Sequence, residues 1–260
     1  MSWQGPFDLV LDASEGVLSL VLLAHGQILV SQEWKLEQRA TEVLAPALQM
    51  MLSLTQLSLK DLRRIACVHG PGSFTAIRLL LTTAMGLRRL RPLELGALNA
   101  LQLTAFELVR RKALAAKQKI VVVTKARRKL LHVQSFLSNE QALPEPLGPV
   151  VLQSPSALLE SLTEGDYLCG SILKNCPDLS SSASNLGLQV LADLERADPQ
   201  TLALAAGLIS YEPADLEPLY VRPCDALDNL ERLAERQGLN GARARQSLDS
   251  LLKAPPCSEL

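Results

Sequence analysis

The sequence predicts an α/β fold, and three observations lead to that prediction. Near the N-terminus, three apolar segments are joined by short turns, which is typical of an antiparallel meander. After them, helical and strand patterns alternate along the chain. A buried strand then runs into Gly70-Pro71-Gly72, and a long apolar helix follows this turn. The order of strands followed by a helix comes twice, which indicates two related halves.

The first half is predicted to have the order βββαβαβα. Its first helix, over residues 36–54, has apolar residues at spacings of three and four, and Pro46 is expected to bend or restart it. Asn99 is expected to cap the helix over residues 100–116. Strands are expected at residues 7–11, 17–23, 28–34, 65–68 and 92–96, and a further helix over residues 74–90.

The second half has a weaker pattern. Residues 120–123 and 130–136 are predicted to form a hairpin whose turn is basic and contains Arg127 and Arg128. The remaining elements are expected to be strands at 150–152 and 166–171, helices over 155–162 and 199–210, and loops over 143–149 and 180–185. The segment 224–260 is predicted to be a loosely held tail with one amphipathic stretch, at Leu227, Leu230, Leu233 and Ala234.

The composition is typical of a soluble globular protein. The chain has 260 residues, 48% of them apolar and 20% charged, with a net charge of −1. This balance gives no basic field for tight nucleic-acid binding, and aromatic residues make up only 3%. No apolar run reaches the roughly 20 residues of a membrane span, and the start does not resemble a signal peptide. Five cysteines without a C-x-x-C pair predict free thiols, no metal and a cytoplasmic location.

The loop Gly70, Pro71, Gly72 and Ser73 lies between a strand and a helix N-terminus, which is the general geometry of an anion site. It lacks the Gly-Lys-Ser/Thr end of a P-loop, and it is not Gly-x-Gly-x-x-Gly. A tight turn that leads into a packed helix is therefore the favoured interpretation. Ser73 is expected to cap that helix with its hydroxyl.

The helix after this loop has an unusual composition. From Ile77 to Leu87, its only polar side chains are Arg78, Thr82 and Thr83. Together with the helix over 36–54, it shows more apolar surface than one sheet can cover, so either a partner helix packs there or the helix is wholly buried. The interface hypothesis names Leu36, Val43, Leu44, Ala47, Met51, Thr75, Arg78, Leu79, Thr82, Thr83 and Gly86.

Three features together resemble one family. They are a first strand that ends at Asp12, the string Gly70-Pro71-Gly72-Ser73-Phe74-Thr75-x-x-Arg78, and Pro218-Leu219-Tyr220-Val221-Arg222 near the end. In this order and at these distances, they are similar to TsaB (YeaZ), a bacterial family of tRNA threonylcarbamoyladenosine synthesis. The resemblance covers roughly residues 7 to 223.

The resemblance implies an actin-like (ASKHA, ribonuclease H-like) fold of two similar subdomains, over residues 1–117 and 118–223, before the tail 224–260. It implies a non-catalytic role without a cofactor or a membrane. The partner would be TsaD, which transfers threonylcarbamoyl to adenosine 37 of tRNA, and TsaE would join a larger complex. The same helical face would also pair two copies of the chain, and the chain would contact tRNA only indirectly.

The sequence departs from the family pattern at the first turn, where Asp12-Ala13-Ser14 replaces Asp-Thr-Ser/Thr. Asp12 and Ser14 are either a vestigial nucleotide site or a turn that bonds its own backbone. An alternative function is an ATP-dependent kinase or ATPase of this fold, but such an enzyme would need an acid where Lys125 stands. A second alternative is a metallopeptidase relic, suggested only by an older label of the family, and no His-Glu-x-x-His supports it.

Overall fold

The computed structural model describes residues 5–37, 39–126, 129–221, 234–236 and 240–243. The chain divides into one compact unit, residues 1–221, and a second unit, residues 222–260, in which 234–236 and 241–243 are helical. Arg127, Arg128 and Arg222, and the predicted amphipathic stretch except Ala234, lie outside the described residues. The predicted subdomain boundary at residue 117 stays a prediction.

The first sheet has five strands in the order β3-β2-β1-β4-β5. Strands β1 (Phe7–Asp12), β2 (Val17–Ala24) and β3 (Gln27–Lys35) form the predicted antiparallel meander. Strands β4 (Leu62–Gly70) and β5 (Glu94–Asn99) extend the sheet in parallel with β1. The strand order confirms the predicted βββαβαβα half, with a 3₁₀ turn at Leu59–Asp61 before β4.

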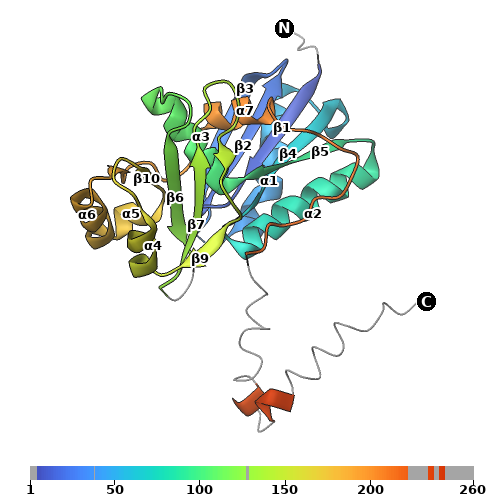
Figure 1. The fold of residues 1–260 in the computed structure, drawn as a ribbon. Coiled ribbons are helices and arrows are strands. Elements are labelled where there is room, and N and C mark those ends of the chain that lie inside the picture. The colour runs from blue at the N-terminus through green and yellow to red at the C-terminus, as the bar shows by residue number, and fades with distance from the viewer. Residues whose placement is uncertain (1–4, 38, 127–128, 222–233, 237–239, 244–260) are drawn as a thin grey trace. The chain divides into compact units, whose positions relative to one another are not determined.

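Helices cover this sheet on both faces (Figure 1). Helices α1 (Ala40–Thr55) and α2 (Phe74–Leu90) pack on one face, and α3 (Ala100–Lys112) packs on the other together with α7 (Pro199–Ala206). Ser73 and Asn99 cap α2 and α3 as predicted, because their side-chain oxygens accept backbone N–H groups of the first turn.

Helix α1 differs from its prediction in two ways. It begins at Ala40 rather than at residue 36, because Glu37 has a left-handed backbone with φ of 37° that a helix cannot include. It then continues through Pro46 without a restart. The apolar face on both sides of the proline, which includes Leu44 and Met51, is buried against the sheet and holds the helix together.

The second sheet has the order β11-β10-β6-β7-β8, and β9 also pairs with β7. Strands β6 and β7 form the predicted hairpin. The strand bounds are β6 (Lys119–Lys125), β7 (Leu131–Leu137), β8 (Glu145–Pro146), β9 (Val151–Gln153), β10 (Tyr167–Cys169) and β11 (Gln189–Leu191). The helices of this half are α4 (Pro155–Ser161), α5 (Ile172–Asn175), α6 (Pro177–Asn185) and α7 (Pro199–Ala206).

The prediction of a loop at residues 180–185 is wrong, because α6 occupies this segment. Its serines are weak helix formers, but Pro177 opens the first turn, and Leu179 and Ala183 are buried in the core of the second sheet. Strand β11 was not predicted either, since three half-exposed residues show no readable alternation. Tertiary packing therefore decided both elements.

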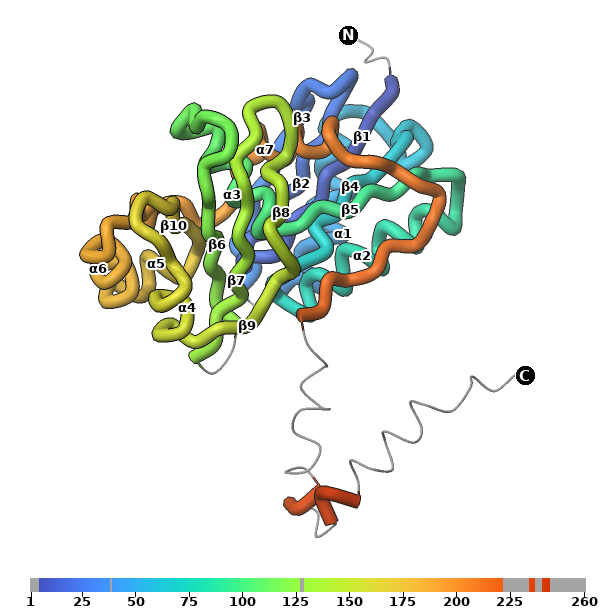
Figure 2. Tube along the Cα trace, viewed as in Figure 1, coloured from blue at the N-terminus to red at the C-terminus, as the bar shows by residue number. Residues whose placement is uncertain are grey.

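Helix α3 lies between the two sheets and joins their cores (Figures 1 and 2). Leu103 and Phe106 pack with the first sheet, whereas Leu101 and Leu108 pack with Ile120 and its neighbours on the second. The cleft described below lies beside this helix.

The segment 211–221 runs from the second half back along α2, as its orange trace shows in Figures 1 and 2. Near its start, Glu212 bridges to Leu95 of β5. Near its end, the backbone N–H of Leu219 donates to the carbonyl of His69 at 2.8 Å. We call residues 211–221 the C-terminal strap.

Candidate functional site

A cleft of about 720 Å³ lies between the two halves of the compact unit. Residues from β2 and β3 line one side, and residues around β6, α5 and the segment before α7 line the other. Its charged lining contains five acids and five bases and is therefore balanced. These are Glu15, Glu33, Asp193, Glu195 and Asp198 with Lys35, Arg111, Lys125, Lys174 and Arg196.

Asp12 and Ser14, the predicted vestigial nucleotide site, are both buried beside this cleft. The Asp12 carboxylate accepts the backbone N–H of Ser14 at 2.9 Å, which is the local turn geometry weighed in the sequence. Burial raises the pKa of Asp12, although the hydrogen bonds from Ser14 oppose this shift. The carboxylate is therefore engaged by its own turn.

The Gly70–Ser73 loop packs directly on that turn. The backbone N–H of Ser73 donates to the Ser14 carbonyl at 3.1 Å. A Cβ added at Gly72 would lie 2.4 Å from the same oxygen, which is far inside van der Waals contact. Ser73 also accepts the N–H of Ala76 through its hydroxyl at 3.4 Å. The two loops close on each other, so this loop serves packing and capping.

Glu15 follows the same turn and is the acid of the cleft with the most perturbed pKa. The pKa of Glu15 is raised to about 7, mainly by burial and to a smaller extent by the nearby charges of Asp12 and Glu195, whereas a hydrogen bond with Ser171 opposes the shift. Ser171 belongs to the second half of the compact unit, so this contact crosses the cleft. Glu15 therefore links the two halves.

Arg196 makes the second link across the cleft. Its Nη1 donates to Glu33 Oε1 at 2.8 Å and to Ser19 Oγ at 3.2 Å, and both partners belong to the first sheet. Lys174 pairs with Glu195 at 2.6 Å within the second half. Lys125, at the end of β6, also lines the cleft.

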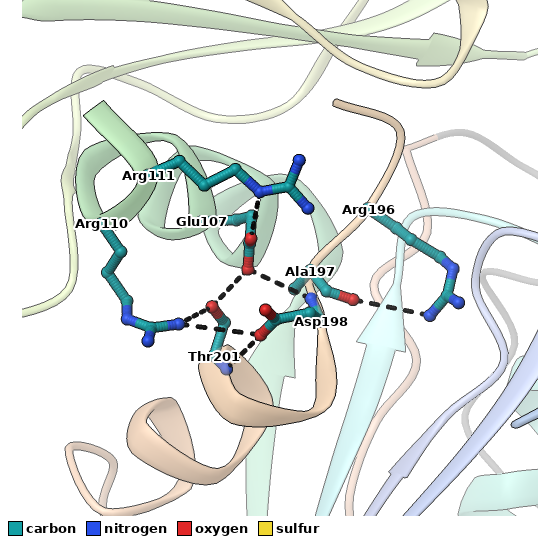
Figure 3. Close-up of polar contacts among 7 residues, drawn as sticks. All are labelled: Glu107, Arg110, Arg111, Arg196, Ala197, Asp198 and Thr201. Atoms are coloured by element: carbon teal, nitrogen blue, oxygen red, sulfur yellow. Dashed lines mark hydrogen bonds and ion pairs between the residues drawn. The ribbon is translucent and has the colours of Figure 1, made fainter. Parts of the chain in front are cut away.

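The segment that carries Arg196 is held by a buried cluster around Glu107 of α3 (Figure 3). The buried Glu107 carboxylate accepts Arg111 Nε at 2.5 Å, the N–H of Asp198 at 3.1 Å, and the hydroxyl of Thr201. Arg110 donates to the same Thr201 hydroxyl. Every acceptor oxygen of Glu107 is satisfied, so the cluster fixes the start of α7 against α3.

The sequence interpretation did not single out Glu107 or Arg196. One signal could have revealed Glu107, since it stands on the helix among Ala105, Phe106 and Leu108, where an unpaired carboxylate would be costly. Arg196 gives no such signal, because its partner Glu33 is 163 residues away in the chain.

The predicted interface residues on α1 and α2 fall into two groups. Leu36, Ala47 and Met51 are buried in the core beneath the helices, so their placement on a free surface is wrong. Leu44 is also buried, but it lines the groove described below. The apolar spacing correctly indicated a helix, but the apolar side that it marks is the one that packs on the first sheet. The other members are half-buried or exposed: Val43, Thr75, Arg78, Leu79, Thr82, Thr83 and Gly86.

Two of these outward residues, Leu79 and Thr83, line a groove between α1 and α2. Its volume is about 480 Å³, and Leu79, Thr83 and Leu87 of α2 line one wall. The other wall comes from α1 and the turn after it, with Leu44, Leu48, Leu52 and Leu57. None of the described residues that line this groove is charged, in contrast to the lining of the cleft.

Large apolar side chains stand exposed around the groove. Leu54 of α1 is 71% exposed, Leu90 at the end of α2 is also exposed, and Met50 is less so. A Cβ at Gly86 would meet nothing within 4 Å, so the backbone of α2 is open to close approach there. We call the outward side of α1 and α2, from Thr41 to Leu59 and from Phe74 to Leu90, the helical face.

Other site types find no support in the described parts of the chain. No group of three or more His, Cys, Asp or Glu side chains in them could hold a metal ion. No helix there is long and apolar enough to cross a membrane. Cys67 and Cys169 are buried free thiols, and burial raises the pKa of Cys67 to about 12, so neither is a reactive thiolate.

Two sheets of this topology with a cleft between them define an actin-like α/β protein of two subdomains. The family model of TsaD, tRNA N6-adenosine threonylcarbamoyltransferase, matches residues 35–165, which is half of the chain. The chain therefore belongs to the TsaD family.

Solved structures confirm the fold. A YeaZ structure from Pseudomonas aeruginosa has a TM-score of 0.65 at 19% identity and covers 83% of this chain and 100% of its own. A second structure, of a protein with similarity to peptidase YeaZ from the same organism, has a TM-score of 0.66 at 18% identity, with coverage of 84% and 100%. Both bear out the resemblance that the sequence motifs indicated. The comparison with curated proteins gave no match.

Proposed function

We propose that this chain is a non-catalytic partner of TsaD in threonylcarbamoyl transfer to adenosine 37 of tRNA, and that it acts through the helical face. The observation that carries the proposal is the character of this face. It is a grooved surface with exposed leucines, and the described residues that line its groove are uncharged, on a member of the TsaD family. Apolar surface of this kind is typical of a protein interface.

The cleft supports a non-catalytic role. Its loops bond each other, Lys174 and Arg196 pair with acids of the cleft, and Lys125 stands where the family resemblance would place the acid that phosphoryl transfer needs. A kinase or ATPase is the second candidate, because the cleft has room for a ligand. Hydrolysis of Mg-ATP by the isolated chain above a no-protein control would favour that candidate.

The mechanism that we propose is support of one conformation of TsaD. A partner surface that binds the working state of TsaD more tightly than its other states raises the population of the working state. TsaE would join this pair in a larger complex, the same face would pair two copies when TsaD is missing, and the assembly would work in the cytoplasm, where tRNA is modified.

The test is the mass in solution of the chain alone and mixed with TsaD, by light scattering after size exclusion. A one-to-one complex that forms at the expense of self-association is expected. Gly86→Trp should abolish this complex and leave the fold intact, because its Cβ position is open. Lys112→Trp, at the exposed end of α3, is the matched control and should bind normally. A folded wild-type chain that forms no complex would contradict the proposal.

A further inference from the structure

The C-terminal strap brings two distant motifs together at the start of α2. Arg78, from the string after the Gly-Pro-Gly loop, lies with its guanidinium carbon 3.9 Å from the centroid of the Phe74 ring. Its Nε donates to the hydroxyl of Tyr220, 142 residues later in the chain, at 2.5 Å. The two rings lie 5.6 Å apart. We call Phe74, Arg78 and Tyr220 the arginine–aromatic cluster.

This cluster lies at the surface rather than in a core. Phe74 is 44% exposed and Tyr220 is 47% exposed, in a chain with few aromatic residues. Within the described residues, the hydrogen bond to Tyr220 is the only one that the Arg78 guanidinium makes. The ring contacts fix the side chain, yet its terminal nitrogens keep their donors available. A guanidinium held in this way loses little conformational entropy when it binds a carboxylate.

The surroundings of Arg78 on the helical face are neutral. From Val43 to Leu59, the sequence has no charged residue, and from Phe74 to Leu87, Arg78 is the only one. The acidic side chain of α1, Glu42, lies at its first turn and pairs with Arg39 at 2.8 Å. Arg88 and Arg89, in the last turn of α2, both pair with Asp215 of the C-terminal strap. A partner that covers the rest of the face must therefore either supply an opposite charge to Arg78 or bury its charge without compensation, which is costly.

We infer that Arg78 is the charged anchor of the helical face and that the partner surface supplies a carboxylate to it. This inference rests on the proposed function and adds what the partner must carry. Among the described residues of this face, the one acid, Glu42, pairs with Arg39, so a second copy of the chain offers Arg78 no unpaired carboxylate there and Arg78 favours a distinct partner over self-association. Charges at interfaces commonly select partners in this way, because they strengthen binding to a complementary partner and weaken binding to another.

Arg78→Met gives a test in which two associations change in opposite directions. Its affinity for TsaD, measured by titration calorimetry, should fall about tenfold. Its self-association, measured by sedimentation equilibrium, should stay equal or become stronger, since no cation is buried. Lys112→Met removes an exposed cation at the end of α3 and should change neither value.

Arg78→Lys keeps the charge and should lose less affinity than Arg78→Met, and it serves as the second variant if the methionine variant unfolds by circular dichroism. Equal TsaD affinity for wild type and both variants would overturn the inference and leave the proposed function standing. Equal weakening of both associations by Arg78→Met would also overturn it, because it would indicate a structural role. If wild-type protein forms no complex with TsaD, both proposals fail.

Discussion

The cleft and the helical face are both surface features of one compact unit, but they treat polar groups in opposite ways. In the cleft, charged side chains are numerous, and several of them pair within the chain, as Arg196 does with Glu33 and Lys174 with Glu195. On the helical face, charge is almost missing, and apolar side chains such as Leu54 stand in solvent. A surface whose charges pair within the chain is suited to a structural role, whereas a surface that leaves apolar side chains exposed to water is suited to binding a partner.

The largest loss of stability is expected when the side chain of Glu107, which holds the segment beside the cleft, is removed. Glu107→Ala should lower the free energy of unfolding by about 2–4 kcal/mol, because it leaves a cavity and orphans the N–H of Asp198 and the hydroxyl of Thr201. Urea unfolding followed by circular dichroism measures this loss. Glu107→Gln keeps the shape and should cost less. A loss below about 1 kcal/mol for alanine would show that the cluster does not hold α7.

Replacing one glycine in each region by alanine should change the stability in opposite directions. Gly72→Ala should destabilise by about 2 kcal/mol, because the new Cβ would overlap the Ser14 carbonyl. Gly86→Ala, on the helical face, should stabilise by about 1 kcal/mol, because it meets open space and alanine is the better helix former. Thermal unfolding of the two variants beside wild type is the measurement. The same sign in both would contradict the assignment of a packed and an open region.

The pKa of Glu15 makes the cleft sensitive to pH. The folded state holds the Glu15 proton up to a pKa of about 7, above the ordinary value of 4.5, so stability is greatest below about pH 4.5 and falls as pH rises toward 7. The difference between wild type and Glu15→Gln should therefore change by about 1–2 kcal/mol between pH 5 and pH 8. Denaturant titrations of both proteins at each pH isolate this residue. A difference that does not change with pH would contradict the raised pKa.

The smallest effect on stability is expected at the most exposed leucine of α1. Leu54→Lys should change the free energy of unfolding by less than about 0.5 kcal/mol, because the side chain already lies in water. Its buried neighbour Met51 is the contrast, since Met51→Lys should prevent folding. Thermal melts test both variants. A large destabilisation by Leu54→Lys would mean that the helical face is part of the core.

Much of the fold followed from the sequence, because its signals are local. The meander, the alternation of strands and helices, and the caps at Ser73 and Asn99 depend on periodicity and on backbone groups a few residues away. The helix α6 and the strand β11 were missed, since their local propensities are weak and their stability comes from packing. The prediction of an interface on α1 and α2 stays a prediction, and three of the residues that it named, Leu36, Ala47 and Met51, lie in the core. The reason is that an apolar helical period does not say whether the sheet or a partner covers the apolar face.

The sequence by itself determined the α/β class, the Gly-Pro-Gly turn and the motifs by which the family was found. Only the tertiary structure decided where the charges of the cleft pair, since Arg196 and Glu33 are far apart in the chain. It alone brought Arg78 and Tyr220 together through the C-terminal strap. The physical reason is that hydrogen-bonded turns, caps and periods are fixed by neighbours in sequence, whereas ion pairs and exposed faces depend on what the folded chain places beside them.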